Sequence, residues 1–415
     1  MTFIHAQEDR AADKGLPNPL FKGKDSRVNF PDDVPTLTDG AVTLRAHHEG
    51  DIQAAYEQCV DPFSQEWTTV PVPYSLEHSR GFVTEIIPAG WRDDSEWAFA
   101  IEAEDDDGTP RFAGTLSLRN EGDLRAEVAY GSHPWARGRG IMLRALNLLL
   151  DWGFEEQNLK TVIWWANRGN WSSRRVAWRL GFSFDGTVRQ WLPQRGDLLD
   201  AWVGVLLSTD ERKPRNPWLD APRIVGETVM LRAHEPKDAV RVQEACSDEH
   251  TAYWLGQMPQ PYTLEMATDF IEGRKETRAL GTGVHWAVVD PVTDDLLANI
   301  SLFDIKPGRE AEIGYWTHPA ARGRGVMSEA CGLVIRHAFI PEEAGGQGLQ
   351  RLLIFAAEGN TASRRVIESN GFVTTGRERS STRLRDESLV DTITYDLLES
   401  EYVGTPRGGP DVASA

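Results

Sequence analysis

The chain repeats itself once, and this repeat limits its possible folds more than any other feature. Residues 42–47, Val-Thr-Leu-Arg-Ala-His, return as residues 229–234, Val-Met-Leu-Arg-Ala-His. The segment Ala-Arg-Gly-Arg-Gly at residues 136–140 returns unchanged at residues 321–325. The spacing between the copies far exceeds the ~20–50 residues of a solenoid repeat. The sequence therefore predicts the duplication of a whole domain.

Domain boundaries follow from where the matching segments begin and end. A chain of 415 residues is long enough for two hydrophobic cores. Charge and proline mark the segment between the copies as a linker. We predict, in chain order, an N-terminal extension (1–40), a first domain (41–208), a linker (209–223), a second domain (224–402) and a tail (403–415).

Composition restricts the partners and the compartment. The chain has 44 Lys+Arg against 63 Asp+Glu, a formal net charge of −19, which disfavours nucleic acid and anionic lipid and favours amines. The chain starts without the apolar stretch of a secretory signal, and its longest apolar run, near residues 146–150, is too short for a membrane span. Three cysteines are too few for a disulfide framework or a metal cage. We expect a cytoplasmic protein that binds no metal, no nucleic acid and no membrane, with Cys59 and Cys246 at equivalent buried helix positions.

Within each copy, the apolar pattern predicts an α/β (α+β) unit whose mixed, mainly antiparallel sheet is flanked by helices. A strand precedes the Arg-Gly-Arg-Gly segment, and an amphipathic helix and a buried strand follow it. A second helix then ends at Gly-Phe. The predicted strands lie at 97–103, 112–118, 126–130 and 161–166 in the first copy and at 284–290, 297–303, 311–316 and 351–356 in the second.

The Arg-Gly-Arg-Gly segment, between a strand and a helix, is a candidate anion site. Glycine lets the backbone approach an anion closely, and the first amides of the following helix are unpaired donors. The arginines can add charge-assisted hydrogen bonds of about 1.5–3 kcal/mol each. A pyrophosphate suits this loop, although glycine-rich loops before helices are common and the spacing fits neither a P-loop nor a Rossmann motif.

A second motif narrows the interpretation. Residues 170–176, Asn-Trp-Ser-Ser-Arg-Arg-Val, lead to Gly-Phe at 181–182, and residues 360–366, Asn-Thr-Ala-Ser-Arg-Arg-Val, lead to Gly-Phe at 371–372. With the preceding loop, these motifs resemble the GNAT acetyltransferases, which have Arg-x-x-Gly-x-Gly/Ala and then Asn-x-x-Ala/Ser before a helix ending in Gly-Phe. The Pro-Tyr-Ser/Thr-Leu-Glu segments and the serine resemble the RimJ/RimL branch. The resemblance covers nearly all of both copies.

The resemblance implies two tandem GNAT folds, each with two central strands that splay apart around the pantetheine arm of acetyl-CoA. The pyrophosphate would lie on the loop and the first helical turn, and the motif asparagine would face the pantetheine amides. The implied cofactor-binding residues are Ser132, His133, Arg137, Gly138, Arg139, Gly140, Ile141, Met142 and Asn170 in the first copy, and Thr317, His318, Arg322, Gly323, Arg324, Gly325, Val326, Met327 and Asn360 in the second.

The chain departs from the family pattern at two places in each copy. Met142 and Met327 stand where the family usually has Gly or Ala, and their amides are still available to an anion. Ala177 and Ile367 stand where many members carry a tyrosine that protonates the leaving thiolate. We therefore expect no tyrosine general acid in either copy.

Acetyl transfer to an amine requires a base, an oxyanion donor and a proton or hydrogen bond for the leaving thiolate. Glu127 and Glu312 are the candidate bases, with a solvated or salt-bridged strand glutamate as the alternative. Ser173 and Ser363 are the candidates at the leaving group, with an ordinary helix N-terminal residue as the alternative. The oxyanion donor is expected to be a backbone amide near Ser132/His133 and Thr317/His318, where the histidine side chains are read as structural. Four helix arginines either reach a cofactor phosphate or are solvated: Arg174, Arg175, Arg364 and Arg365.

These features predict an N-acetyltransferase that transfers acetyl from acetyl-CoA to a primary amine by direct attack in a ternary complex. The acceptor is a protein N-terminus, as the resembled branch suggests, or a small amine. The alternative is an acyl-CoA-binding regulatory protein in which one or both domains are inactive. Both copies keep the loop, which favours the enzyme, and the oligomeric state stays open.

Overall fold

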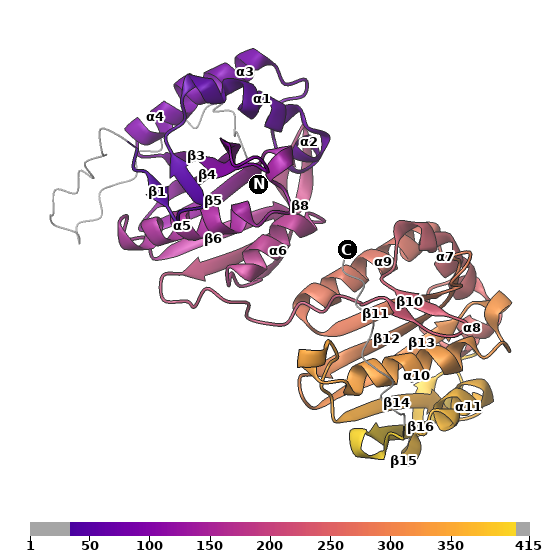
Figure 1. The fold of residues 1–415 in the computed structure, drawn as a ribbon. Helices are drawn as coiled ribbons and strands as arrows, with labels where there is room; N and C mark the ends of the chain where they lie inside the picture. The colour runs from indigo at the N-terminus through magenta and orange to yellow at the C-terminus, as the bar shows by residue number, and fades with distance from the viewer. Residues whose placement is uncertain (1–33, 404–415) are drawn as a thin grey trace, which may run out of the picture. The chain divides into compact units, whose positions relative to one another are not determined.

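The computed structural model describes residues 34–403 (Figure 1). Most of the predicted N-terminal extension and nearly all of the predicted tail lie outside the described residues. The chain divides into two compact units between Arg215 and Asn216, within the segment predicted as the linker. The exact domain limits stay a prediction. No helix among residues 34–403 is long and apolar enough to span a bilayer.

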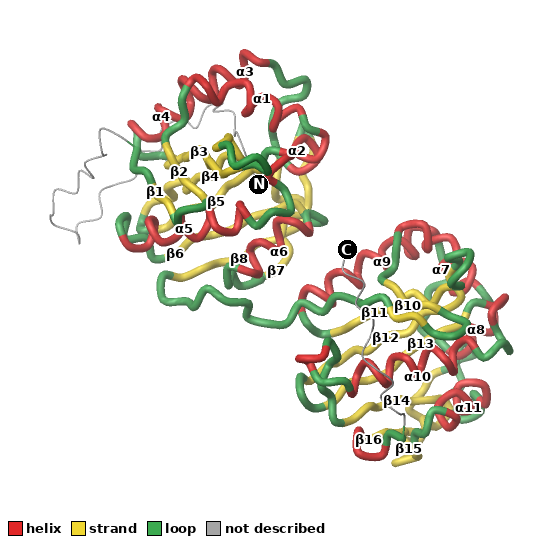
Figure 2. Tube along the Cα trace, viewed as in Figure 1, coloured by secondary structure: helices red, strands yellow, loops and turns green. Residues whose placement is uncertain are grey.

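The first unit is an eight-stranded sheet with helices on both faces (Figure 2). The strands follow the order β1-β2-β3-β4-β5-β6-β8-β7. Its strands are β1 Leu37–Thr38, β2 Val42–Arg45, β3 Glu96–Glu104, β4 Pro110–Gly122, β5 Arg125–Ser132, β6 Thr161–Asn167, β7 Gly186–Gln194 and β8 Asp197–Leu207. Its helices are α1 Ile52–Val60, α2 Pro62–Trp67, α3 Leu76–Gly81, α4 Ile87–Arg92, α5 Ile141–Glu155 and α6 Trp171–Arg179.

The second unit repeats this architecture, with the strand order β15-β16-β14-β13-β12-β11-β10-β9. Its strands are β9 Ile224–Val225, β10 Met230–Arg232, β11 Gly283–Val289, β12 Leu296–Lys306, β13 Glu310–Thr317, β14 Arg351–Ala357, β15 Val373–Arg383 and β16 Leu389–Leu398. Its helices are α7 Ala239–Ser247, α8 Glu249–Trp254, α9 Leu264–Leu280, α10 Val326–Phe339 and α11 Thr361–Ser369.

The helix after each glycine loop packs its apolar stripe on one face of its sheet. In α5, Ala145, Leu146, Leu149 and Leu150 are buried against β3, β4 and β5. The first helix of the unit, α1, packs on the opposite face with Ala100 of β3 (Figure 1). Both the predicted fold class and the predicted burial of Cys59 and Cys246 in equivalent helices are confirmed.

Two neighbouring strands in each sheet run parallel and then separate. The β5–β6 pairing extends from Arg125 with Thr161 to Val128 with Trp164, and it stops there although both strands continue. The β13–β14 pairing likewise stops after Glu312 with Leu353. The other strand neighbours are antiparallel within the described residues. Each sheet therefore opens at its centre, as the family resemblance implies.

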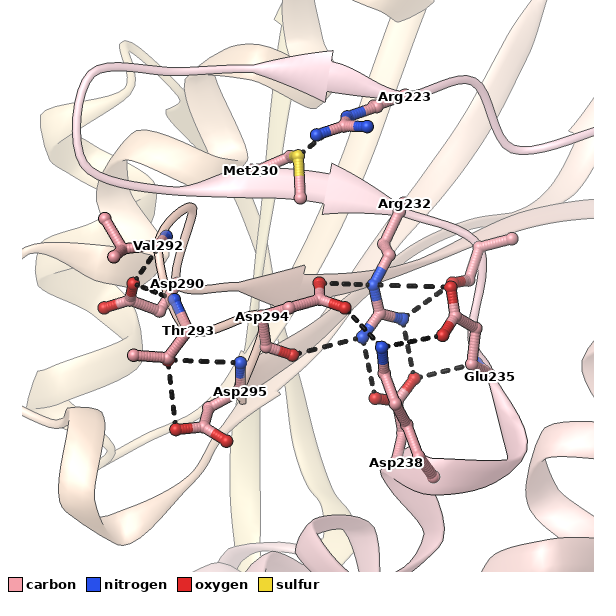
Figure 3. Close-up of polar contacts among 12 residues, drawn as sticks. Arg223, Met230, Arg232, Glu235, Asp238, Asp290, Val292, Thr293, Asp294 and Asp295 are labelled. Carbon is pink, nitrogen blue, oxygen red and sulfur yellow. Dashed lines mark hydrogen bonds and ion pairs between the residues drawn. The ribbon is translucent and has the colours of Figure 1, made fainter.

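An arginine ties the start of each unit to its first helices. Arg232 of β10 donates two hydrogen bonds to the Asp238 carboxylate, at 2.8 and 2.9 Å, and one to Asp294 at 2.8 Å (Figure 3). Arg45 and Asp51 form the same bidentate pair in the first unit, at 2.8 and 2.9 Å. This contact explains why the Leu-Arg segment and the aspartate six residues later occur in both copies.

Among the strands that the sequence analysis did not predict are the terminal hairpins, β7–β8 and β15–β16. β15 is mostly exposed and rich in polar residues, so it lacks the apolar alternation by which a strand is recognised. It forms a strand because it pairs with β16, which its own composition does not predict.

Replacing Arg232 by Met should lower the free energy of unfolding of the second unit by about 3–5 kcal/mol, because the Asp238 carboxylate would stay buried without its cation. The exposed pair between Arg383 and Glu387 supplies the control, since Arg383→Met should cost less than about 1 kcal/mol. Calorimetric unfolding measures both, and equal losses would contradict the anchoring role of Arg232.

Candidate active site

The glycine loop before α5 and before α10 has a left-handed backbone at both glycines. Gly138 and Gly140 have φ of +75° and +74°, and Gly323 and Gly325 have +73° and +77°. No atom lies within 4 Å of a β-carbon built at any of the four. Gly140 and Gly325 are the N-caps, and no side chain caps either helix. The first amides of α5 and α10 are therefore available to an anion above an open loop.

A cavity borders each loop, with a volume of about 260 Å³ in the first unit and about 490 Å³ in the second. Among the predicted cofactor residues, those that line the cavities are Ser132, Arg137, Gly138, Gly140, Met142 and Asn170, and Thr317, Arg322, Gly323, Gly325, Val326, Met327 and Asn360. The others are outside these linings: His133, Arg139, Ile141, His318 and Arg324.

The first arginine of each loop is held by an aspartate. Arg137 donates to Asp61 at 2.6 Å and to Ser64 at 3.0 Å. Arg322 pairs with Asp248 and donates to the Thr251 hydroxyl. These aspartates are the N-caps of α2 and α8, so each arginine fastens a helix to the loop. The second arginine of the first loop, Arg139, pairs with the exposed Asp106.

The motif asparagine caps the helix that follows the buried central strand. Asn170 accepts a hydrogen bond from the Ser173 amide at 3.1 Å, and Asn360 accepts one from the Ser363 amide at 3.1 Å. Both asparagines line the cavities. Because the cap uses the side-chain oxygen, the side-chain amide nitrogen is the group left for a carbonyl of a bound molecule.

A tyrosine outside the family's helix position lies beside each motif serine. The Tyr130 hydroxyl is 2.8 Å from the Ser173 hydroxyl, and the Tyr315 hydroxyl is 3.0 Å from the Ser363 hydroxyl. All four side chains line the cavities. Burial raises the pKa of Tyr130 to about 12 and also raises the pKa of Tyr315. The tyrosines come from β5 and β13, so a search limited to the helix position missed them.

The two candidate bases are on the paired part of β5 and β13, outside the cavity linings, and their surroundings differ. Glu127 accepts a hydrogen bond from Arg119 at 3.1 Å, and burial raises its pKa. In the first sheet Glu127 is paired with Arg119 of the neighbouring strand, whereas in the second sheet Glu312 is paired with Phe303. Burial and the nearby Asp304 raise the pKa of Glu312 to about 7.

The histidines next to the loops brace helices. His133 pairs with Glu57 of α1 at 3.3 Å, and His318 pairs with Glu244 of α7 at 3.0 Å. Their backbone amides donate to the carbonyls of neighbouring strands at 2.8 Å. The histidine amides are therefore not free to stabilise an oxyanion. Of the backbone amides predicted as oxyanion donors, those of Ser132 in the first unit and Thr317 in the second remain.

The helix arginines were predicted either to reach a cofactor phosphate or to be solvated, and the structure places them in different surroundings. Arg174 is buried with its guanidinium 3.9 Å from the centre of the Phe184 ring. Arg364 donates to the Tyr395 hydroxyl at 2.8 Å. Arg365 lines the cavity of the second unit, and Arg179, which the sequence analysis missed, lines that of the first. Each cavity therefore has one helix arginine in its lining.

Comparison with known proteins identifies the class. The acetyltransferase (GNAT) domain family matches residues 41–183 and 228–373, more than half of the chain. The chain therefore belongs to the GNAT acetyltransferases and carries two such domains. It is an acetyltransferase enzyme of this family.

Similar proteins include several with ribosomal names. YdaF of Bacillus subtilis (strain 168), provisionally named a ribosomal N-acetyltransferase, is 31% identical over 185 residues, which are 43% of this chain and 96% of YdaF. The ribosomal-protein-serine acetyltransferase of Escherichia coli (strain K12) is 33% identical over 94 residues, 22% of this chain and 50% of that protein. A solved structure of RimL, the ribosomal L7/L12 alpha-N-protein acetyltransferase, with coenzyme A is 22% identical. It covers 42% of this chain and 96% of its own, with a TM-score of 0.37.

The arginine–aspartate contact of the loop can be tested on coenzyme A binding. Asn caps helices about as well as Asp, so Asp248→Asn removes the charge and keeps the cap. We expect the Kd of coenzyme A at the second unit, measured by calorimetry, to rise several-fold because the loop loses its brace. If Arg322 served chiefly as a phosphate ligand, freeing it from Asp248 would tighten binding, and that result would contradict the bracing role.

Proposed function

We propose that both units transfer acetyl from acetyl-CoA to a primary amine by direct attack, and that the acceptor is a protein N-terminus. The main support for this proposal is the opening between the two parallel strands. It lies next to a cavity, and the cavity is bordered by the start of a helix that has no side-chain cap. A cap asparagine lines the same cavity. The ribosomal names of similar proteins favour a protein acceptor over a small amine. The function also requires a cytoplasmic location, which stays an expectation.

In the proposed reaction, the first amides of α5 and α10 bind the pyrophosphate, and the side-chain amides of Asn170 and Asn360 bind a pantetheine carbonyl. The amine nitrogen attacks the thioester carbon, its N–C bond forms, and the C–S bond breaks. The backbone amide of Ser132 or Thr317 would stabilise the oxyanion, a contribution of ~10²–10³ in rate for such donors.

A regulatory acyl-CoA-binding protein without turnover is the second candidate, and the first unit supplies the observation in its favour. Arg119 neutralises Glu127 there, whereas Glu312 has no ion pair within residues 34–403. If the second unit were inactive as well, the chain would bind acyl-CoA without turnover. Release of free thiol from acetyl-CoA in the presence of N-terminal peptides separates the two candidates.

Aspartate variants of the loop glycines test the cofactor sites. In Gly140→Asp and Gly325→Asp, a carboxylate repels the phosphates and a β-carbon is forced into left-handed backbone, which costs about 1–2 kcal/mol. Calorimetric titration with acetyl-CoA should find two sites in the native chain and one in each variant. Gly273→Asp, on the open side of α9 with normal backbone, should keep both. No binding to the folded native chain would refute the proposal.

The pH dependence of the second unit tests Glu312 as its base. With the first unit silenced by Gly140→Asp, kcat should rise as the pH passes through about 7, since Glu312 is protonated below that pKa and cannot accept the amine proton. Glu312→Gln should lower kcat by about 10²–10⁴ and abolish this rising limb of the pH profile. A rising limb that is caused by deprotonation of the acceptor amine would remain in this variant. An unchanged limb in Glu312→Gln would exclude Glu312 as the base.

A further inference from the structure

We propose that Tyr130 and Tyr315 are the proton sources for the departing thiolate and that each acts through its neighbouring serine. This inference rests on the proposed function and adds a residue to its mechanism. The family position that carries such a tyrosine in many members holds Ala177 and Ile367 here, both buried in the cores. The strand tyrosines of β5 and β13 bring a phenol within hydrogen-bond distance of the motif serine.

The same contact occurs in both units, and its residues belong to the repeat: Ala-Glu-x-x-Tyr at residues 126–130 and 311–315, and Ser-Arg-Arg-Val at residues 173–176 and 363–366. The two hydroxyl pairs, Tyr130 with Ser173 and Tyr315 with Ser363, are 2.8 and 3.0 Å apart. In both units the two side chains lie in the cavity that also receives the glycine loop.

The hydrogen-bond pattern of Ser173 directs its proton into the cavity. A serine hydroxyl has one donor and two acceptor positions. The Trp164 indole can only donate, and it does so to the Ser173 hydroxyl at 3.0 Å. The Tyr130 hydroxyl lies 2.8 Å from the Ser173 hydroxyl and 3.3 Å from the Ser173 carbonyl, and it can donate to either. In the proposed arrangement Tyr130 donates to the serine hydroxyl, and the serine hydrogen is left for a group inside the cavity, where the sulfur of acetyl-CoA would lie. In the second unit Ile354 of β14 stands at the Trp164 position, so Tyr315 alone orients Ser363.

The chemistry also favours the phenol as the source of the proton. Burial raises the pKa of Tyr130 to about 12 and also raises that of Tyr315, but a phenol is still a far stronger acid than a serine hydroxyl, so of the two groups the tyrosine is the better source of the proton. As the C–S bond breaks, the sulfur takes the serine proton and the serine oxygen takes the tyrosine proton. The resulting tyrosinate is reprotonated from solvent, and the proton lost by the amine goes to the base.

The test uses the full chain with both tyrosines replaced, Tyr130→Phe with Tyr315→Phe, and Tyr402→Phe as a matched control. Tyr402 packs on Phe339, away from both cavities. With acetyl-CoA and an N-terminal peptide, kcat should fall about 10²–10³ in the double variant while the Kd of coenzyme A changes less than about threefold. Adding Ser173→Ala and Ser363→Ala should cause little further loss, because the two groups act in series. Losses that multiply, or a kcat within about threefold of native, would overturn the inference.

A second readout does not depend on turnover. The thiol of bound coenzyme A can be titrated by the ultraviolet absorbance of its thiolate. The serine hydrogen stabilises the thiolate, so the pKa of the bound thiol should rise by about one unit in the double variant, and an unchanged value would overturn the inference. If the pKa of the bound thiol is higher in the double variant than in the native chain, but the native chain acetylates no amine, the proposed function fails and the assignment of the tyrosines stands. If the double variant does not fold, the paired serine variants are titrated in its place, with the same rise expected and the same refutation.

Discussion

The separation of two parallel strands is the constraint on which each unit depends. Beyond Val128 and Trp164 in the first unit, β5 and β6 continue without each other, and their facing backbone groups need another partner. An extended molecule that carries amides can take that place without breaking the rest of the sheet. The cavity, the glycine loop and the capped helix are arranged around this opening, so the fold and the cofactor site have one common cause.

Charge in these units serves mainly to hold elements together. Arg45 and Arg232 fasten the first strands to the first helices, and Arg137 and Arg322 fasten the glycine loops to α2 and α8. Each is paired with a carboxylate in both copies. The anion site then depends chiefly on backbone amides, which a folded loop presents without desolvating a free cation.

The repeat and the two glycine-containing motifs were enough to predict the fold class and most central strands, and the cofactor residues stay a prediction. Contacts between segments distant in sequence could not be predicted. Tyr130 is 43 residues before Ser173, and Arg137 is 76 residues after Asp61, so only the folded sheet brings them together. The polar hairpin strand β15 lacked a pattern of its own, because its order comes from its partner strand.

The two units are similar in plan and differ in the groups next to the opening. The first has Arg119 against its glutamate and Trp164 on its serine, whereas the second has neither. A crystal structure of the chain with acetyl-CoA would test the account most directly. It predicts the pantetheine arm between β5 and β6 and between β13 and β14, with the thioester beside Ser173 and Ser363. Coenzyme A bound elsewhere, with the two openings empty, would contradict it.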